Sequence, residues 1–144
     1  NMFNFDFECT QVLDMGTGTG VLAVLAIKLG AKHALAIDNN EWAFDNAMDN
    51  IKLNNCEGKI NVEIGESELI EGKTFDYILA NINRNVILSD LPLYEKSLNK
   101  DGALLVSGIM THDVEHVLNK AKEVGLILET LEEKDNWNLF VFKK

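Results

Sequence analysis

The sequence predicts an α/β fold of the doubly wound type, built on a mostly parallel seven-stranded sheet that ends in an antiparallel hairpin. Short apolar segments alternate with longer segments of helical periodicity through residues 11–125. The last two apolar segments follow each other directly across residues 134–136 (KDN), which is typical of a hairpin. Because parallel strands are joined by right-handed crossovers, this order of elements favours a doubly wound sheet.

The individual elements follow from length, apolar content and the residues at their ends. Strands are predicted over residues 11–15, 33–38, 59–64, 75–81, 103–109, 126–133 and 138–142. Helices are predicted over residues 19–29, 41–54, 85–98 and 111–124. Gly30 is expected to close the first helix, Pro92 to perturb the third, and Thr111 to serve as the N-cap of the last.

Composition limits the class of protein. The chain has 144 residues, with 13 Lys and Arg against 23 Asp and Glu, so its formal net charge is -10. That charge disfavours direct binding to nucleic acid. No apolar run is long enough to span a membrane, and no signal peptide is visible at the start.

Cys9 and Cys56 lie far apart and are interpreted as reduced thiols of a cytoplasmic protein. His112 and His116 are one helical turn apart, but nothing completes a metal site, and none is expected.

A glycine-rich loop, residues 14–20 (DMGTGTG), follows the first predicted strand. Gly16 and Gly18 would allow a tight turn and a close approach of the backbone to a ligand, and Gly20 would let the helix pack against the strand. The dinucleotide fingerprint is GxGxxG, whereas this loop reads GxGxG directly after an acid, Asp14. A carboxylate there would repel a pyrophosphate and attract a cation. A loop without a ligand, or an Asp14 that merely caps backbone amides, remains an alternative.

Further polar residues follow the next three strands. Asp38 ends the second strand, where a carboxylate can accept hydrogen bonds from both hydroxyls of a ribose. Glu66 follows the third strand, where an adenine edge could be recognised. Asn81 ends the fourth, and its amide oxygen can accept a hydrogen bond from an amine or a cofactor. The alternatives are surface acids at Asp38 and Glu66 and a helix cap at Asn81.

Four segments carry a resemblance to a known group of enzymes. In order they are DMGTGTGVLA, AIDNNEWAFDNAMDNIKLNN, FDYILANI and LLVSGI, and they resemble the class I S-adenosylmethionine-dependent methyltransferases, which have a Rossmann-like fold. The ANI and SGI segments and the closing EKDNWNLFVF hairpin are most similar to the bacterial ribosomal protein L11 methyltransferases. The resemblance extends over about residues 11–144.

This resemblance implies the cofactor S-adenosyl-L-methionine and the methylation of lysine or other amino groups on a ribosomal large-subunit protein. It implies that Gly16, Asp38 and Asn81 contact the cofactor and that Asn81 is also catalytic. The whole expected cofactor-binding set is Asp14, Gly16, Thr17, Gly18, Gly20, Asp38, Asn39, Glu66 and Asn81. Thr17 stands where the family often has cysteine.

Two departures from the family pattern shape the expectation for domains. The family has an N-terminal substrate-recognition domain, and a glycine-rich segment with a histidine just ahead of the first motif. This sequence shows neither, so residues 1–144 are expected to form the methyltransferase catalytic domain alone. Residues 81–84 (NINR) replace the Asn-Pro-Pro-aromatic motif of many amine methyltransferases, which disfavours adenine, cytosine or glutamine as the methyl acceptor.

Three other functions stay open at this point. A methyltransferase acting on a small molecule or RNA would share most of these motifs, and so would a noncatalytic cofactor-binding module. A nicotinamide-dependent dehydrogenase is disfavoured by Asp14 and by the GxGxG spacing.

Overall fold

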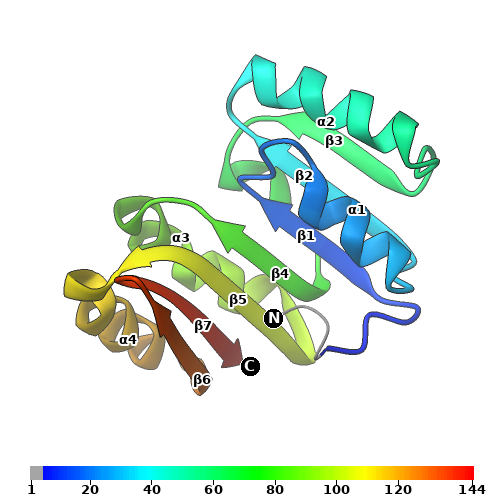
Figure 1. Ribbon diagram of the computed structural model, residues 1–144. Helices are drawn as coiled ribbons and strands as arrows, with labels where there is room; N and C mark the ends of the chain where they lie inside the picture. Colours follow the sequence, from blue (N-terminus) through cyan, green and yellow to red (C-terminus); the bar gives the residue numbers. More distant parts are fainter. Residues whose placement is uncertain (1–4) are drawn as a thin grey trace. The chain divides into compact units, whose positions relative to one another are not determined.

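The computed structural model describes residues 5–144 and divides into two compact units, unit 1 up to Leu69 and unit 2 from Ile70. Unit 1 contains β1 (Gln11–Met15), α1 (Val21–Lys28), β2 (His33–Asp38), α2 (Glu41–Leu53) and β3 (Ile60–Ile64). Its strands are parallel and lie in the order β3-β2-β1, with both helices packed on them and on each other (Figure 1).

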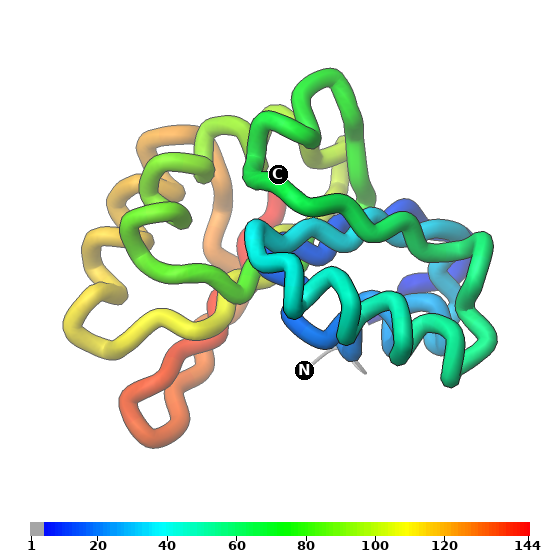
Figure 2. Tube along the Cα trace, turned by 90° about the horizontal axis from the view of Figure 1, so that it is seen from above, coloured from blue at the N-terminus to red at the C-terminus, as the bar shows by residue number. Residues whose placement is uncertain are grey.

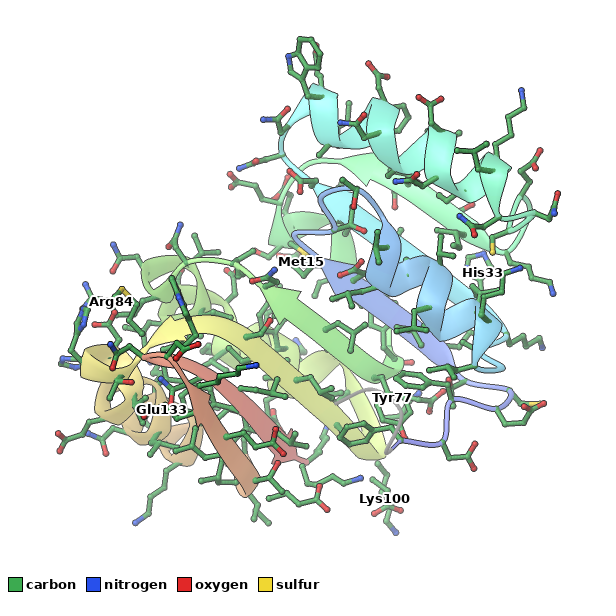
Figure 3. The ribbon with its side chains drawn as sticks, in the orientation of Figure 1. Met15, His33, Tyr77, Arg84, Lys100 and Glu133 are labelled. Atoms are coloured by element: carbon green, nitrogen blue, oxygen red, sulfur yellow. The ribbon has the colours of Figure 1, made fainter. Side chains whose placement is uncertain are left out.

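The register of unit 1 brings the ends of its strands to one edge. Met15 is paired with Ile37, and Asp38 with Ile64, so the loops that follow all three strands begin side by side. Figure 3 shows Met15 and His33 at opposite edges of this unit, since one ends a strand and the other begins one. The candidate residues of unit 1 therefore come together because the strands are parallel.

Unit 2 contains the remaining strands and helices. They are β4 (Phe75–Asn81), α3 (Arg84–Ser97), β5 (Leu98–Met110), the short 3₁₀ helix η3 (Thr111–Asp113), α4 (Val114–Glu123), β6 (Ile127–Lys134) and β7 (Trp137–Lys143). The strand order is β4-β5-β7-β6; β4 and β5 are parallel, whereas β7 is antiparallel to both β5 and β6. Helix α3 packs on β4 and β5, and α4 packs on β6.

Each unit has its own apolar core, drawn from the inward faces of its strands and helices. In unit 1 the fully buried side chains include Leu13, Ala36, Ile37 and Ala47. In unit 2 they include Ile78, Leu104, Phe140 and Tyr94, and the rings of Phe140 and Phe142 stack at 5.5 Å. Burial of these side chains fixes the strands from whose ends the polar loops extend.

The predicted fold class, seven strands that are mostly parallel with a C-terminal antiparallel hairpin, is confirmed. The hairpin turns at Asp135 and Asn136, whose φ values of 52° and 68° are those of a type I′ turn. Figure 2 shows this turn as the orange-to-red loop at the lower left.

Two details differ from the prediction. The fifth strand is longer than expected and begins at Leu98, directly after α3. Thr111 is not the N-cap of the last helix, because it begins a 3₁₀ turn and α4 starts only at Val114. Its hydroxyl instead donates a hydrogen bond of 2.6 Å to Glu133 on β6.

The start of α2 depends on a side-chain cap. Asn40 accepts a hydrogen bond of 2.8 Å from the backbone N–H of Trp42 through its amide oxygen. We expect Asn40→Ala to lower the free energy of unfolding by about 1 kcal/mol, since an N–H of the first turn loses its acceptor. Urea denaturation measures this effect. Asn39→Ala, one residue earlier and outside the cap, is the matched control, and equal losses in both variants would contradict the prediction.

Candidate functional site

The glycine loop of unit 1 is tied to the end of β2 by three hydrogen bonds. The backbone N–H groups of Gly16 and Thr17 both donate to the carbonyl of Ile37, at 2.8 and 2.9 Å. The N–H of Gly18 donates to Asp38 Oδ2 at 3.0 Å. The loop after β1 is therefore held against the carboxylate that ends β2 by its own backbone.

The alternating glycines have a conformational cause. Gly16, Gly18 and Gly20 all have positive φ values, 78°, 57° and 80°, which side chains disfavour. A Cβ on Gly18 would meet nothing within 4 Å, so open space lies beside this part of the loop. A Cβ on Gly20 would lie 3.1 Å from Cβ of Ala47. The missing side chain of Gly20 thus serves the packing of α1 against α2, rather than against the strand as predicted.

Asp14 is buried beneath this loop, with 1% of its surface exposed. Its Oδ2 accepts a hydrogen bond of 2.6 Å from the Thr17 hydroxyl, while its Oδ1 is buried without a hydrogen-bond partner. Desolvation by burial raises the pKa of the Asp14 carboxyl from 3.8 to about 6, against the lowering effect of the Thr17 hydroxyl. The charge of nearby Asp38 raises this pKa further. Asp14 is therefore a buried charge under the loop and not an exposed acid at its entrance.

Asp38 is half-buried and serves as an acceptor for two backbone groups. Besides the bond from Gly18, its Oδ1 accepts a hydrogen bond of 3.1 Å from the N–H of Asn40. A carboxylate oxygen can accept a second hydrogen bond, so both oxygens retain capacity for a ligand hydroxyl. Asp38 thus links the glycine loop to the loop that leads into α2.

Asn39 and Glu66 lie near Asp38 in unit 1, and both are exposed. The N–H of Gly65 donates to the carbonyl of Asp38 at 2.9 Å, which brings the start of the β3 loop beside the end of β2. Glu66 accepts a hydrogen bond of 3.1 Å from Leu69 through its backbone carbonyl, at the 3₁₀ turn Ser67–Ile70. The expected residues after β1, β2 and β3 are therefore brought to a common edge.

Asn81, the one expected site residue in unit 2, is exposed at the carboxyl end of β4 and is paired with Ser107 on β5. The helix cap at this point is Asn83, whose amide oxygen accepts the N–H of Val86 at 3.0 Å. The capping alternative for Asn81 is therefore not what the structure shows, and its side chain is available for another role.

The loops that follow β4 and β5 are joined by an ion pair. Arg84 Nη1 lies 2.8 Å from Asp113 Oδ1, and Asp113 is largely buried. Figure 3 shows Arg84 and Tyr77 at opposite edges of unit 2, with Glu133 near the Arg84 edge. Among the hollows of unit 2, those of about 650 and 380 Å³ are both lined by Gly108 and Trp137. The polar carboxyl edge of unit 2 is thus hollowed close to β5.

Several side-chain contacts of the candidate site were not predicted from the sequence. The hydrogen bond from the Thr17 hydroxyl to the Asp14 carboxylate was not predicted. The spacing D-x-x-T could have indicated this bond, since it places both groups in one turn. The position of the Asn81 amide in the space beside Gly108 could not be predicted from the residues around either position.

Within residues 5–144 no cluster of three or more His, Cys, Asp or Glu side chains could hold a metal ion. Cys9 and Cys56 are both free thiols, the first exposed and the second buried. None of the helices in this range is long and apolar enough to cross a membrane.

Comparison with known proteins decides the family. The sequence profile of the family "Ribosomal protein L11 methyltransferase (PrmA)" matches residues 4–144. The chain belongs to the PrmA family. A ribosomal protein L11 methyltransferase of Phocaeicola vulgatus is 41% identical over 133 residues, which cover 92% of this chain and 47% of the relative. One from Clostridium perfringens is 37% identical over 137 residues, covering 93% of this chain and 42% of the relative.

The structural comparison agrees with the family. A crystal structure of ribosomal protein L11 methylase from Lactobacillus delbrueckii subsp. bulgaricus has a TM-score of 0.90 and 27% sequence identity, covering 98% of this chain and 72% of that chain. The Rossmann-like methyltransferase fold is therefore confirmed, and the PrmA family uses S-adenosylmethionine. This chain spans about half the length of the curated PrmA relatives that it matches.

The residues of unit 1 fit this cofactor. Space is open beside Gly18, where a ligand can approach the backbone, and a carboxylate with spare acceptor capacity lies next to it at Asp38. The buried charge of Asp14 lies under the same loop, where a negative field favours a cationic group. A cationic nucleoside suits these features better than a pyrophosphate does.

Proposed function

We propose that this chain is the catalytic domain of an S-adenosylmethionine-dependent protein methyltransferase that methylates lysine or other amino groups of ribosomal protein L11. Membership of the PrmA family supports the reaction and the acceptor. The observation that supports the proposal is the Gly18–Asp38 hydrogen bond, which holds a carboxylate with spare acceptor capacity beside a loop open to a ligand. We further propose that the protein is cytoplasmic. We also propose that it makes no direct contact with nucleic acid, which its net charge of -10 supports.

The proposed roles follow the geometry of unit 1. Asp38 accepts hydrogen bonds from the sugar hydroxyls, and Glu66 lies where the base would be recognised. Gly16 and Gly18 allow the close approach of the backbone. The carboxylate of Asp14 is buried, so its role is indirect. It holds the glycine loop through its hydrogen bond with Thr17, and its negative charge lies under that loop. Gly20 keeps α1 in place, and Asn39 extends the edge beside Asp38.

In unit 2 we propose that Asn81 receives the amine. The cofactor supplies an electrophilic methyl group for an in-line displacement, so the protein mainly positions the acceptor. A lysine with a pKa near 10.4 must first lose a proton, which at pH 7 costs roughly 5 kcal/mol. The Asn81 amide oxygen can accept a hydrogen bond from an N–H of the neutral amine, which orients the nitrogen lone pair for the displacement.

The proposal is tested by methyl transfer from labelled S-adenosylmethionine, catalysed by the full-length protein. Label is expected on purified ribosomal protein L11 and absent from ribosomal RNA and from an extract of small metabolites. Label on RNA or on a metabolite alone would support the other enzyme classes. Binding of S-adenosylhomocysteine without any transfer would favour a noncatalytic module.

Replacing the amine-binding group should affect turnover most. We expect Asn81→Ala to lower kcat roughly 100-fold at saturating cofactor, as removal of a single transition-state hydrogen bond does elsewhere. Steady-state kinetics with L11 measures this change. Asn85→Ala, an exposed asparagine in the first turn of α3, is the control and should retain kcat. An unchanged kcat in Asn81→Ala would remove this residue from the mechanism.

A further inference from the structure

A bulge interrupts β5 beside Asn81. In the pairing of β5 with β7, Ser107 lies opposite Leu139 and Ile109 opposite Asn138, so Gly108 is an extra residue without a partner. Its φ is +83°, which is the left-handed conformation of a glycine bulge. Ser107 is itself the parallel partner of Asn81 on β4, so the bulge comes directly after the point where β5 passes Asn81.

The space of the missing side chain is occupied by the Asn81 amide. A Cβ built on Gly108 would lie 2.6 Å from Asn81 Oδ1, closer than real Cβ contacts come. The next atom within reach is Cγ of the same asparagine, at 3.9 Å. Apart from its chain neighbours Ser107 and Ile109, no other residue within 5–144 supplies an atom within 4 Å. The space that a Cβ on Gly108 would need is therefore occupied by the side chain of Asn81, the proposed amine acceptor.

We propose that Gly108 is a positioning residue for methyl transfer: its bulge leaves room for the Asn81 amide and thereby sets the direction of the amide oxygen. The catalytic part of this proposal rests on the proposed function of Asn81, whereas the contact between position 108 and the Asn81 amide does not. A Cβ at position 108 would push the amide away from β5, and a reacting group displaced by about 1 Å can lose two orders of magnitude in rate.

The obvious objection is that glycine is needed here only because φ is positive. The chain offers a matched control for that objection. Gly58 also has a φ of +83°, and a Cβ on it would meet nothing within 4 Å. Gly58→Ala therefore introduces the same backbone strain as Gly108→Ala but without displacing a side chain. An excess effect of Gly108→Ala over Gly58→Ala that disappears when Asn81 is also replaced by alanine is due to Asn81.

The first test uses the full-length protein and separates geometry from activity. The side-chain amide resonances of Asn81, assigned by their loss in Asn81→Ala, should shift in Gly108→Ala and stay in place in Gly58→Ala. In the same variants, kcat for L11 should fall roughly 10- to 100-fold in Gly108→Ala and stay unchanged in Gly58→Ala. Resonances that do not move, or equal losses of kcat in both variants, would overturn the proposal.

The second test is a double-mutant cycle that does not depend on catalysis. If the clash with Asn81 destabilises Gly108→Ala, then adding Asn81→Ala should restore the urea midpoint to that of Gly58→Ala. The cycle also covers the case in which Gly108→Ala alone fails to fold. A double variant that stays as unstable as Gly108→Ala, or that also fails to fold, would show that position 108 needs glycine for its backbone alone. A failure of the proposed function looks different. In that case Asn81→Ala leaves kcat unchanged, while the Asn81 amide resonances still shift in Gly108→Ala.

Discussion

Asp14→Asn is expected to raise the free energy of unfolding by up to about 3 kcal/mol at pH 8. The Asp14 carboxyl is buried, and burial raises its pKa from 3.8 to about 6. At about 1.4 kcal/mol for each tenfold change in the ionisation constant, a charge at this position costs about 3 kcal/mol above pH 6. Asparagine keeps an acceptor for the Thr17 hydroxyl without the charge.

The pH dependence gives this prediction its sign. Between pH 4 and 6 the folded state binds more protons at Asp14 than the unfolded state does, so this group lowers stability as the pH rises. The gap between variant and wild type should thus be small at pH 4 and reach its full size above about pH 6. Urea denaturation at pH 4, 6 and 8 measures it. Asp45→Asn, exposed on α2, controls for removing one negative charge, and a gap independent of pH would contradict the prediction.

Asp38→Ala is expected to weaken the binding of S-adenosylhomocysteine about 100-fold. Each hydrogen bond to a charged group contributes about 1.5–3 kcal/mol, and the proposed complex has two from the sugar. The substitution also removes the acceptor of the Gly18 N–H, so the loop loses its tie to β2. Both effects act in the same direction on affinity.

Calorimetry with the full-length protein measures this loss. Asp38→Asn keeps one oxygen acceptor in place and should fall between wild type and Asp38→Ala. If Asp38→Ala binds as tightly as wild type, the sugar does not lie at this carboxylate, and the assignment of the cofactor site to the edge of unit 1 fails with it.

Much of the fold could be predicted because its signals are local. Apolar segments of strand length, helical spacing and the residues between them located the seven strands and four α-helices of the described residues but not the two 3₁₀ turns, and acids at strand ends pointed to one edge. Thr111 shows where this reasoning stops. Its sequence context is that of an N-cap, but its hydroxyl finds Glu133, 22 residues away, which no pattern around residue 111 contains.

The candidate site shows the same limit. Asp38 and Asn81 were identified because they end strands, which sequence periodicity locates. Neither the burial of Asp14 nor the approach of Gly108 to the Asn81 amide follows from neighbours in the chain. Both depend on how strands pack and bulge, so side-chain environments had to come from the structure.

The carbonyl of Ile37, which accepts two N–H groups of the glycine loop, has a consequence for the energetics of recognition. Because folding itself fixes this loop, its conformational entropy is already lost before any ligand arrives. In the proposed complex an incoming nucleoside would therefore meet a preorganised loop, and little of its binding free energy would be spent on ordering the backbone.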